Sequence, residues 1–199
     1  DFGFKKINKM NFEDQYRFKN TELIFTLFKS GDLREDSGFY FSAGNFSGLL
    51  TVDANNLNFL KLPNVDLFAS SFAGGAHGYP LNCENYDLQD RIKMIQIDKN
   101  FIKKTKFKYI EKIKPTYFLP YAGFFKEKLK RDDIYIKYNK KNNTKDYKKI
   151  CKKYNVKLLN PEKENIFEFF KDKRLKSSVY KKKYYKDISP KKYLNYFIK

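Results

Sequence analysis

The stretch VDLFASSFAGGAHGYP, residues 65–80, decides the fold of this chain. Its first six residues, 65–70, form a short and largely apolar run, which is typical of a buried strand. The ten residues that follow hold three glycines and end in Pro80, as loops with close backbone approach do. The stretch therefore predicts a buried strand that ends in a glycine-rich loop.

A long amphipathic helix is predicted after this loop. Between residues 86 and 113, apolar side chains recur at three- and four-residue spacing, and two lysines, Lys106 among them, interrupt the stripe. Residues 116–119 (TYFL) form a second short strand before another loop, 120–125. Strand, helix and strand make a β-α-β unit with parallel strands. Both loops then lie at one edge of the sheet, where open α/β sheets bind ligands.

Segments on both sides extend this unit into an α/β fold with a mixed sheet. They are strands at 22–29, 39–42 and 48–52, the last ending at Asp53, a helix at 144–154 and a strand at 156–159. We assign residues 1–160 to this body. Residues 161–199 are rich in lysine and tyrosine, and we expect a peripheral segment that is helical in short pieces.

The composition of the chain limits the classes of protein to which it can belong. With 41% hydrophobic and 19% aromatic residues among 199, the chain can pack a core. No apolar run approaches the roughly 18–20 residues of a membrane span, so we expect no membrane partner. The chain begins at Asp1, without Met or a signal peptide, which suggests a piece of something longer. Cys83 and Cys151 are far apart, which argues against a disulfide framework, a cysteine zinc site or an iron–sulfur cluster held here, and favours the cytoplasm.

The net charge of +19 raises the question of nucleic-acid binding. Lysine, asparagine, isoleucine, phenylalanine and tyrosine are all abundant, as an AT-rich genome produces, and many lysines cluster in the last third. A solvated basic face is therefore the favoured interpretation. Attraction of a small anion or its phosphate comes second, and a dedicated nucleic-acid surface last.

Asp53 and the loop 71–80 are the candidates for chemistry. Asp53 is either a loop cap or a hard oxygen ligand that bridges divalent metals at the sheet rim. Gly74, Gly75 and Gly78 either form a tight turn or expose N–H groups to an oxyanion or phosphate. Their spacing fits neither a Walker loop nor the dinucleotide fingerprint.

His77 is the only histidine in the chain. One histidine cannot build a histidine-based metal site, so His77 is either an incidental polar loop residue or a single ligand or acid/base. No serine or cysteine nucleophile can be paired with a base from the sequence. Spacing alone thus predicts a ligand-binding α/β edge of undefined chemistry.

Three segments together resemble the CMP-N-acetylneuraminate hydroxylase family. Residues 50–53 (LTVD) end a strand as the family's T-V-D does. Residues 72–80 (FAGGAHGYP) are similar to its F-A-G-G-A-S-G-F-P, and residues 120–125 (PYAGFF) to its P-F-A-G-Y-F. Order and intervals agree as well, and the resemblance covers about residues 36–160.

The resemblance implies a place in a larger enzyme. That family joins an N-terminal Rieske iron–sulfur domain to a metallo-β-lactamase-like domain. It hydroxylates the N-acetyl methyl of CMP-sialic acid, with oxygen and electrons relayed from a reductase and a cytochrome. This chain would be the second half of the αββα sandwich of the latter domain, with the Rieske cluster in an upstream domain. Asp53 would hold a divalent metal, iron or zinc.

The implied binding set surrounds a CMP-sialic acid or a related nucleotide sugar. Backbone amides of the first loop would hold phosphate or carboxylate, and aromatic rings would stack on a base or sugar. The residues of this set are Gly74, Gly75, His77, Gly78, Tyr79, Tyr121 and Gly123.

The chain departs from the family at several positions. It lacks the H-x-H-x-D-H motif and the Rieske cysteines and histidines, which would have to lie upstream. His77 and Ser71 replace a family serine and aspartate, and no histidine occurs near Leu129. Two alternatives therefore stay open, a metal-dependent hydrolase resembling a phosphodiesterase and a metal-free ligand-binding derivative.

Overall fold

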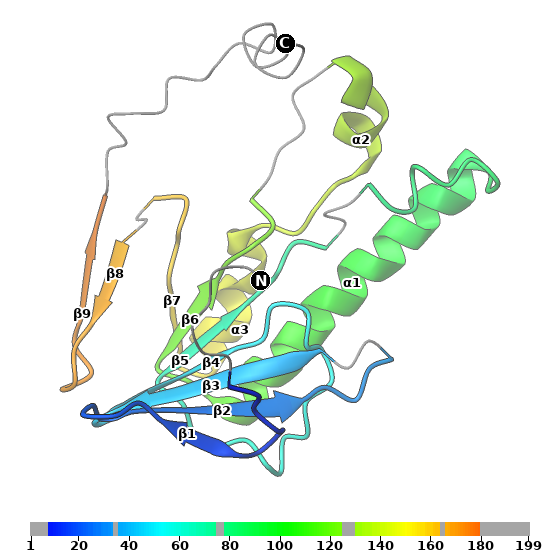
Figure 1. The fold of residues 1–199 in the computed structure, drawn as a ribbon. Coiled ribbons are helices and arrows are strands. Elements are labelled where there is room, and N and C mark those ends of the chain that lie inside the picture. The colour runs from blue at the N-terminus through cyan, green and yellow to red at the C-terminus, as the bar shows by residue number, and fades with distance from the viewer. Residues whose placement is uncertain (1–7, 34–35, 75–77, 125–129, 164–165, 180–199) are drawn as a thin grey trace, which may run out of the picture.

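The computed structural model describes residues 8–33, 36–74, 78–124, 130–163 and 166–179. A seven-stranded mixed sheet lies at its centre, with strands in the order β1 to β7 (Figure 1). The strands are β1 (Gln15–Arg17), β2 (Leu23–Lys29), β3 (Ser37–Ala43), β4 (Phe46–Leu50), β5 (Leu67–Ser70), β6 (Tyr117–Pro120) and β7 (Lys157–Leu158).

The sheet changes character at β4. Strands β1 to β4 pair antiparallel, whereas β4 to β7 pair parallel. Helix α1 (Leu88–Ile113) is the crossover between β5 and β6, and Phe68 of β5 lies opposite Phe118 of β6. The predicted α/β fold, mixed sheet and β-α-β unit are confirmed. The metallo-β-lactamase-like sandwich stays a prediction.

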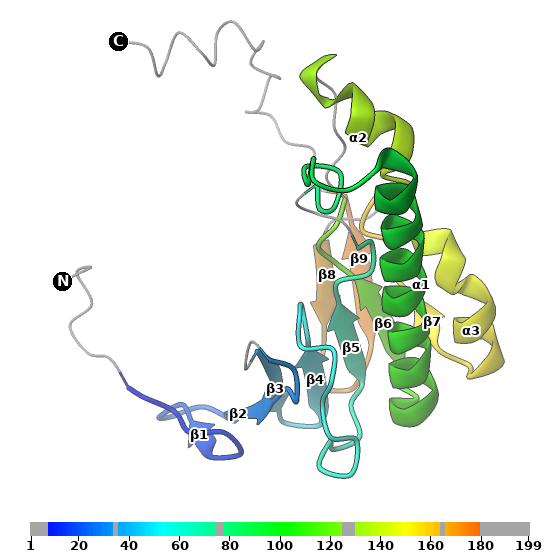
Figure 2. The same cartoon turned by 90° about the vertical axis from the view of Figure 1, so that its right-hand side faces the viewer.

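Helices cover one face of the sheet (Figure 2). They are α1 and α3 (Lys148–Lys153), the latter preceded by a 3-10 turn, η2 (Thr144–Tyr147). The Phe68 ring stacks on Tyr109 of α1 with centroids 5.4 Å apart, and Phe118 contacts Tyr147 at the same centroid distance. The connection from β6 to η2 holds a further 3-10 turn, η1 (Lys130–Asp132), and a short helix, α2 (Asp133–Tyr138).

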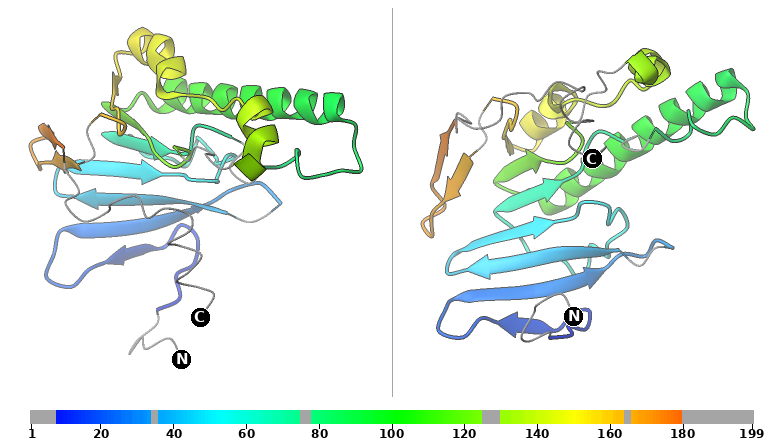
Figure 3. Two further views of the ribbon diagram at one scale, coloured as in Figure 1. Left: turned by 90° about the horizontal axis from the view of Figure 1, so that it is seen from above. Right: turned by 45° about the horizontal axis from the view of Figure 1, so that its top comes forward.

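A two-stranded hairpin, β8 (Ile166–Phe169) and β9 (Leu175–Ser178), packs against the sheet (Figure 3). Its apolar side chains contact Phe46, and Phe46 and Phe169 stack with centroids 4.9 Å apart. Residues that alternate along a strand point to opposite faces. Leu67 contacts the hairpin cluster and the next residue, Phe68, the helix cluster, so the hairpin covers the face opposite α1. The prediction of short helices was wrong for these residues.

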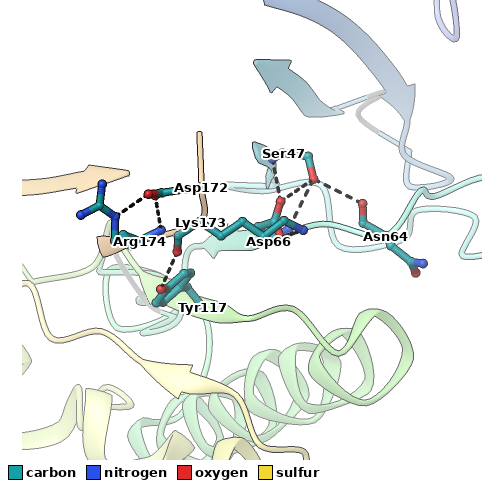
Figure 4. Close-up of polar contacts among 7 residues, drawn as sticks. All are labelled: Ser47, Asn64, Asp66, Tyr117, Asp172, Lys173 and Arg174. Carbon is teal, nitrogen blue, oxygen red and sulfur yellow. Dashed lines mark hydrogen bonds and ion pairs between the residues drawn. The ribbon is translucent and has the colours of Figure 1, made fainter. Parts of the chain in front are cut away.

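Polar contacts of Asp66 link the turn of the β8–β9 hairpin to the sheet (Figure 4). Asp66 is 6% exposed, and its carboxylate accepts a hydrogen bond from Ser47 N–H at 2.9 Å and lies 2.8 Å from Lys173 Nζ. The Tyr117 hydroxyl donates to the Lys173 carbonyl at 3.0 Å. These contacts lie where β5 and β6 begin, at the end of the sheet away from the predicted loops.

Candidate functional site

The parallel strands bring three chain segments to one edge. Leu50 of β4 pairs with Ala69 of β5, and Ala69 pairs with Leu119 of β6, so the three strands end side by side. Beyond them, the hydroxyls of Thr51 and Ser70 are 2.8 Å apart. The loop edge predicted from the β-α-β unit is therefore present. β4 ends at Leu50, so two residues, Thr51 and Val52, lie between the end of this strand and Asp53, where the sequence predicted none.

A cavity of about 980 Å³ lies between this edge and α1. Four residues of the predicted set line it, namely Asp53, Gly74, Tyr79 and Gly123. Asp98 of α1 and Asp32 add two more carboxylates to its wall. Carboxylates accept hydrogen bonds from hydroxyl groups. The walls therefore suit a ligand that carries several hydroxyls.

Two other predicted site residues, Tyr121 and Gly78, are not among the residues that line this cavity. The Tyr121 hydroxyl is hydrogen-bonded to the Val52 backbone, and burial, opposed by that hydrogen bond, raises the pKa of Tyr121. The Cα of Gly78 faces the ring of Tyr135, because a Cβ on Gly78 would lie 2.6 Å from a ring carbon. Gly75 and His77 fall outside the described residues. The structure thus assembles part of the predicted set around the cavity.

Gly123 explains how closely the two loops approach. Its φ is +112°, and a Cβ built there would lie 2.5 Å from the Cβ of Ala73. Both the backbone conformation and the lack of space require glycine. Gly74 also has a positive φ, +70°, beside the Asp98 carboxylate. The backbone of each loop therefore packs directly against a neighbouring group, Ala73 at Gly123 and the Asp98 carboxylate at Gly74.

Lys106 is a residue that the sequence analysis did not select. It is fully buried, and its Nζ donates a hydrogen bond to Asn55 Oδ1 at 2.6 Å and lies 5.7 Å from the Tyr109 ring centroid. Burial lowers the pKa of Lys106 to about 8, and the nearby charge of Asp53 opposes the shift. The only sequence signal was a lysine inside an apolar helical stripe, which by itself indicates nothing about a partner.

The described residues do not complete a divalent metal site. Within the part of the chain that the structure describes, no three histidine, cysteine, aspartate or glutamate side chains form a metal-binding group. Protein metal sites usually take three or four such ligands. Asp53 contributes one exposed carboxylate, and the buried cation of Lys106 lies close enough to interact with it.

A second cavity, of about 420 Å³, adjoins the first. Gly123 lines both cavities. The other walls of the second cavity come from the loop after β6, from α2 and from the segment before η2. They include Phe124, Tyr135, Lys140 and Asn142. Two adjoining cavities of different composition can bind two parts of one ligand.

The fold and cavities define an α/β protein with a mixed sheet and a candidate site at the loop edge of its parallel strands. No protein-family model matches the chain. The chain is 29% identical over 126 residues to the cytidine monophosphate-N-acetylneuraminic acid hydroxylase of Asterias rubens, which covers 61% of this chain and 19% of that relative. The relative of that name from Xenopus laevis is 34% identical over 97 residues, 47% of this chain and 16% of the relative.

A third relative of the same name, from Pan troglodytes, is 30% identical over 108 residues, which are 53% of this chain and 18% of that protein. The matched region thus spans less than a fifth of each relative. The resemblance noted in the loop segments is confirmed as a similarity over about half of this chain. Within the described ranges, no helix combines the length and apolarity needed to cross a bilayer.

Proposed function

We propose that this chain is part of an oxidoreductase that acts on a CMP-activated sialic acid. The observation that carries the proposal is the similarity to three hydroxylases of that substrate name over 97 to 126 residues. The cavity at the carboxyl edge of the sheet supports it, because it offers carboxylates for sugar hydroxyls and a half-exposed ring, that of Tyr79. The Rieske cluster, the metal and the electron donors belong to the proposal for the complete protein.

The residues of this chain would bind and orient the substrate. Asp53 and Asp98 would accept hydrogen bonds from hydroxyls, and the Tyr79 ring would cover one side of the ligand. The tight contact of Gly123 with Ala73 would hold the two loops in one geometry. Pre-set loops reduce the ordering cost of binding.

Turnover by the complete protein tests the proposal. CMP-N-acetylneuraminate is incubated with oxygen and a reduced electron donor, and mass spectrometry follows the gain of one oxygen atom. Asp53→Asn should slow the reaction, whereas Asp90→Asn, on the exposed part of α1, should not. Release of CMP without any oxygen gain would instead support the metal-dependent hydrolase.

A second candidate is a binding module without a metal, and Lys106 favours it. Its buried ammonium group interacts with Asp53 and can supply the positive charge that a metal would supply. In that case the chelator-washed protein binds CMP-N-acetylneuraminate as tightly as the untreated protein. Loss of binding on chelation, restored by iron or zinc, would exclude this candidate.

A further inference from the structure

Asn142, in the wall of the smaller cavity, has one unused hydrogen-bonding atom. The residue is 4% exposed, its Nδ2 donates to the Lys99 carbonyl at 2.9 Å, and its backbone N–H donates to the Ala73 carbonyl at 3.1 Å. Its Oδ1 is buried and has no hydrogen-bond partner among the described residues. The contact with Lys99 fixes the amide orientation, because only the NH₂ side can donate to a carbonyl.

A buried acceptor without a partner costs about 1–3 kcal/mol. Such an atom calls for a group that completes its hydrogen bonding, and a ligand in an adjacent cavity is one such group. Asn142 is among the residues that line the cavity, and a small displacement of the wall would open its Oδ1 to a donor group bound there. The amide therefore favours a ligand that presents an N–H donor over one that presents a carbonyl.

Aromatic residues form the apolar part of the same wall. Phe124 packs on Phe72 with ring centroids 4.8 Å apart, and both line the cavity together with Tyr135 and Ile136. Flat heteroaromatic rings stack on such side chains in proteins that bind single nucleotides. Rings and a lone amide oxygen together fit an amino-substituted base.

The charges of the two cavities differ. The smaller cavity carries Lys140 and Lys141 beside one carboxylate, that of Glu162, whereas the larger carries three aspartates and Lys108. A phosphate is attracted by ammonium groups and repelled by carboxylates. The smaller cavity is therefore the better place for a phosphate, in contrast to the sequence-based expectation that the 72–80 amides hold it.

We propose that the smaller cavity binds the nucleoside monophosphate half of the ligand. The base stacks near Phe124, its exocyclic amine donates to Asn142 Oδ1, and Lys140 lies on the phosphate side. The larger cavity, which shares Gly123 with it as a lining residue, takes the hydroxylated remainder. This inference rests on the proposed function and assigns its substrate to two subsites.

Calorimetric titration of the 199-residue chain with CMP, UMP and cytidine tests it. CMP should bind at least tenfold more tightly than UMP, because UMP has a carbonyl where CMP has the amine. Asn142→Leu should remove that preference. Lys140→Ala should weaken the binding of CMP at least threefold and leave the affinity for cytidine unchanged. Lys145 is exposed and lies outside the cavity, so Lys145→Ala should change neither affinity.

The outcomes separate the two proposals. Equal affinity for CMP and UMP in the unaltered chain overturns the assignment of the base, even if Asn142→Leu does not fold. If Asp98→Asn loses CMP binding and Lys140→Ala does not, the nucleotide binds in the larger cavity. That result contradicts the inference and leaves the proposed function standing. If neither CMP nor CMP-N-acetylneuraminate binds at any concentration tested, both proposals fall.

Discussion

Lys106 Nζ donates a hydrogen bond to Asn55 Oδ1 over 2.6 Å, joining α1 to the segment that follows β4. A neighbouring side chain of α1 makes a similar link, because the Tyr109 hydroxyl accepts from Leu57 N–H at 2.9 Å. The segment that carries Asp53 is thus fixed to the helix at two points. Its position depends on contacts more than fifty residues apart in sequence.

Replacing Lys106 should change how stability depends on pH. Burial lowers the pKa of Lys106 from 10.5 to about 8. Above pH 8 the folded protein has released this proton while the unfolded chain keeps it to about pH 10.5, so the site's contribution to the free energy of unfolding rises between these values. Lys106→Met removes that dependence. The parent therefore gains stability between pH 7 and pH 10 that the variant does not gain. The free energy of unfolding of Lys106→Met, measured relative to the parent, should be about 2–3 kcal/mol lower at pH 10 than at pH 7.

Urea denaturation of both proteins at the two pH values measures this difference. Subtracting the parent removes the contributions of Tyr109 and Cys151, whose pKa values burial raises to about 12. A stability difference that is the same at pH 7 and pH 10 would show that Lys106 does not titrate in this range.

Gly123→Ala should destabilise the protein by about 2–4 kcal/mol, because the new Cβ meets the Cβ of Ala73 and φ is +112°. Gly31→Ala is the matched control. Its Cβ would lie closest to the movable side-chain nitrogen of Asn56, at 3.0 Å, with the other atoms of Asn56 at ordinary contact distance, so a loss below about 1 kcal/mol is expected. Chemical denaturation gives both values. Similar losses in the two variants would contradict the close packing of the loops.

The two cysteines should differ in reactivity. Cys151 is buried, and burial raises its pKa to about 12, whereas Cys83 is half-buried in a loop. Thiolate is the reactive form. A thiol reagent at pH 8 should label Cys83 in the native protein and both residues only after denaturation, as peptide mass spectrometry would show. Rapid native labelling of Cys151 would mean that α3 opens readily.

Asp66→Ala should loosen the hairpin more than Lys173→Ala does. Removing the buried carboxylate leaves the Ser47 N–H without its acceptor, at a cost of about 1–3 kcal/mol. Lys173→Ala removes only an ion pair whose lysine is 54% exposed, and the hydrogen bond from Ser47 N–H to Asp66 remains. Hydrogen exchange in residues 166–178 reports the opening. Faster exchange in Lys173→Ala than in Asp66→Ala would reverse this ranking.

The strands of the parallel half of the sheet could be predicted from the sequence. The predicted strand 65–70 begins two residues before β5 and ends with it, and the predicted strand 116–119 is displaced from β6 by one residue at each end. Short apolar runs followed by turn residues mark buried strands. Asp53, Gly74 and Gly123 reached one cavity for the same reason: strand order and direction bring their loops together. Asn142 and Lys106 could not be selected, because their roles depend on long-range contacts.

The hairpin of β8 and β9 was missed for local reasons. Phe167 and Phe169 alternate with more exposed residues, but the period spans only four positions. The turn contains no glycine, and its left-handed residue is Lys173, with φ +67°. A lysine-rich segment with such a turn has no strong strand signal, so its pairing is fixed by the Asp66 contacts and the sheet face that it covers.

The change from antiparallel to parallel pairing at β4 also bears on how the chain folds. β2, β3 and β4 follow one another closely in the sequence, so their pairing closes small loops and costs little chain entropy. β5 and β6 can pair only once the whole of α1 lies between them, which closes a far larger loop. Contacts distant in sequence slow folding. We therefore expect the edge that carries the candidate site to be the last part of the sheet to form.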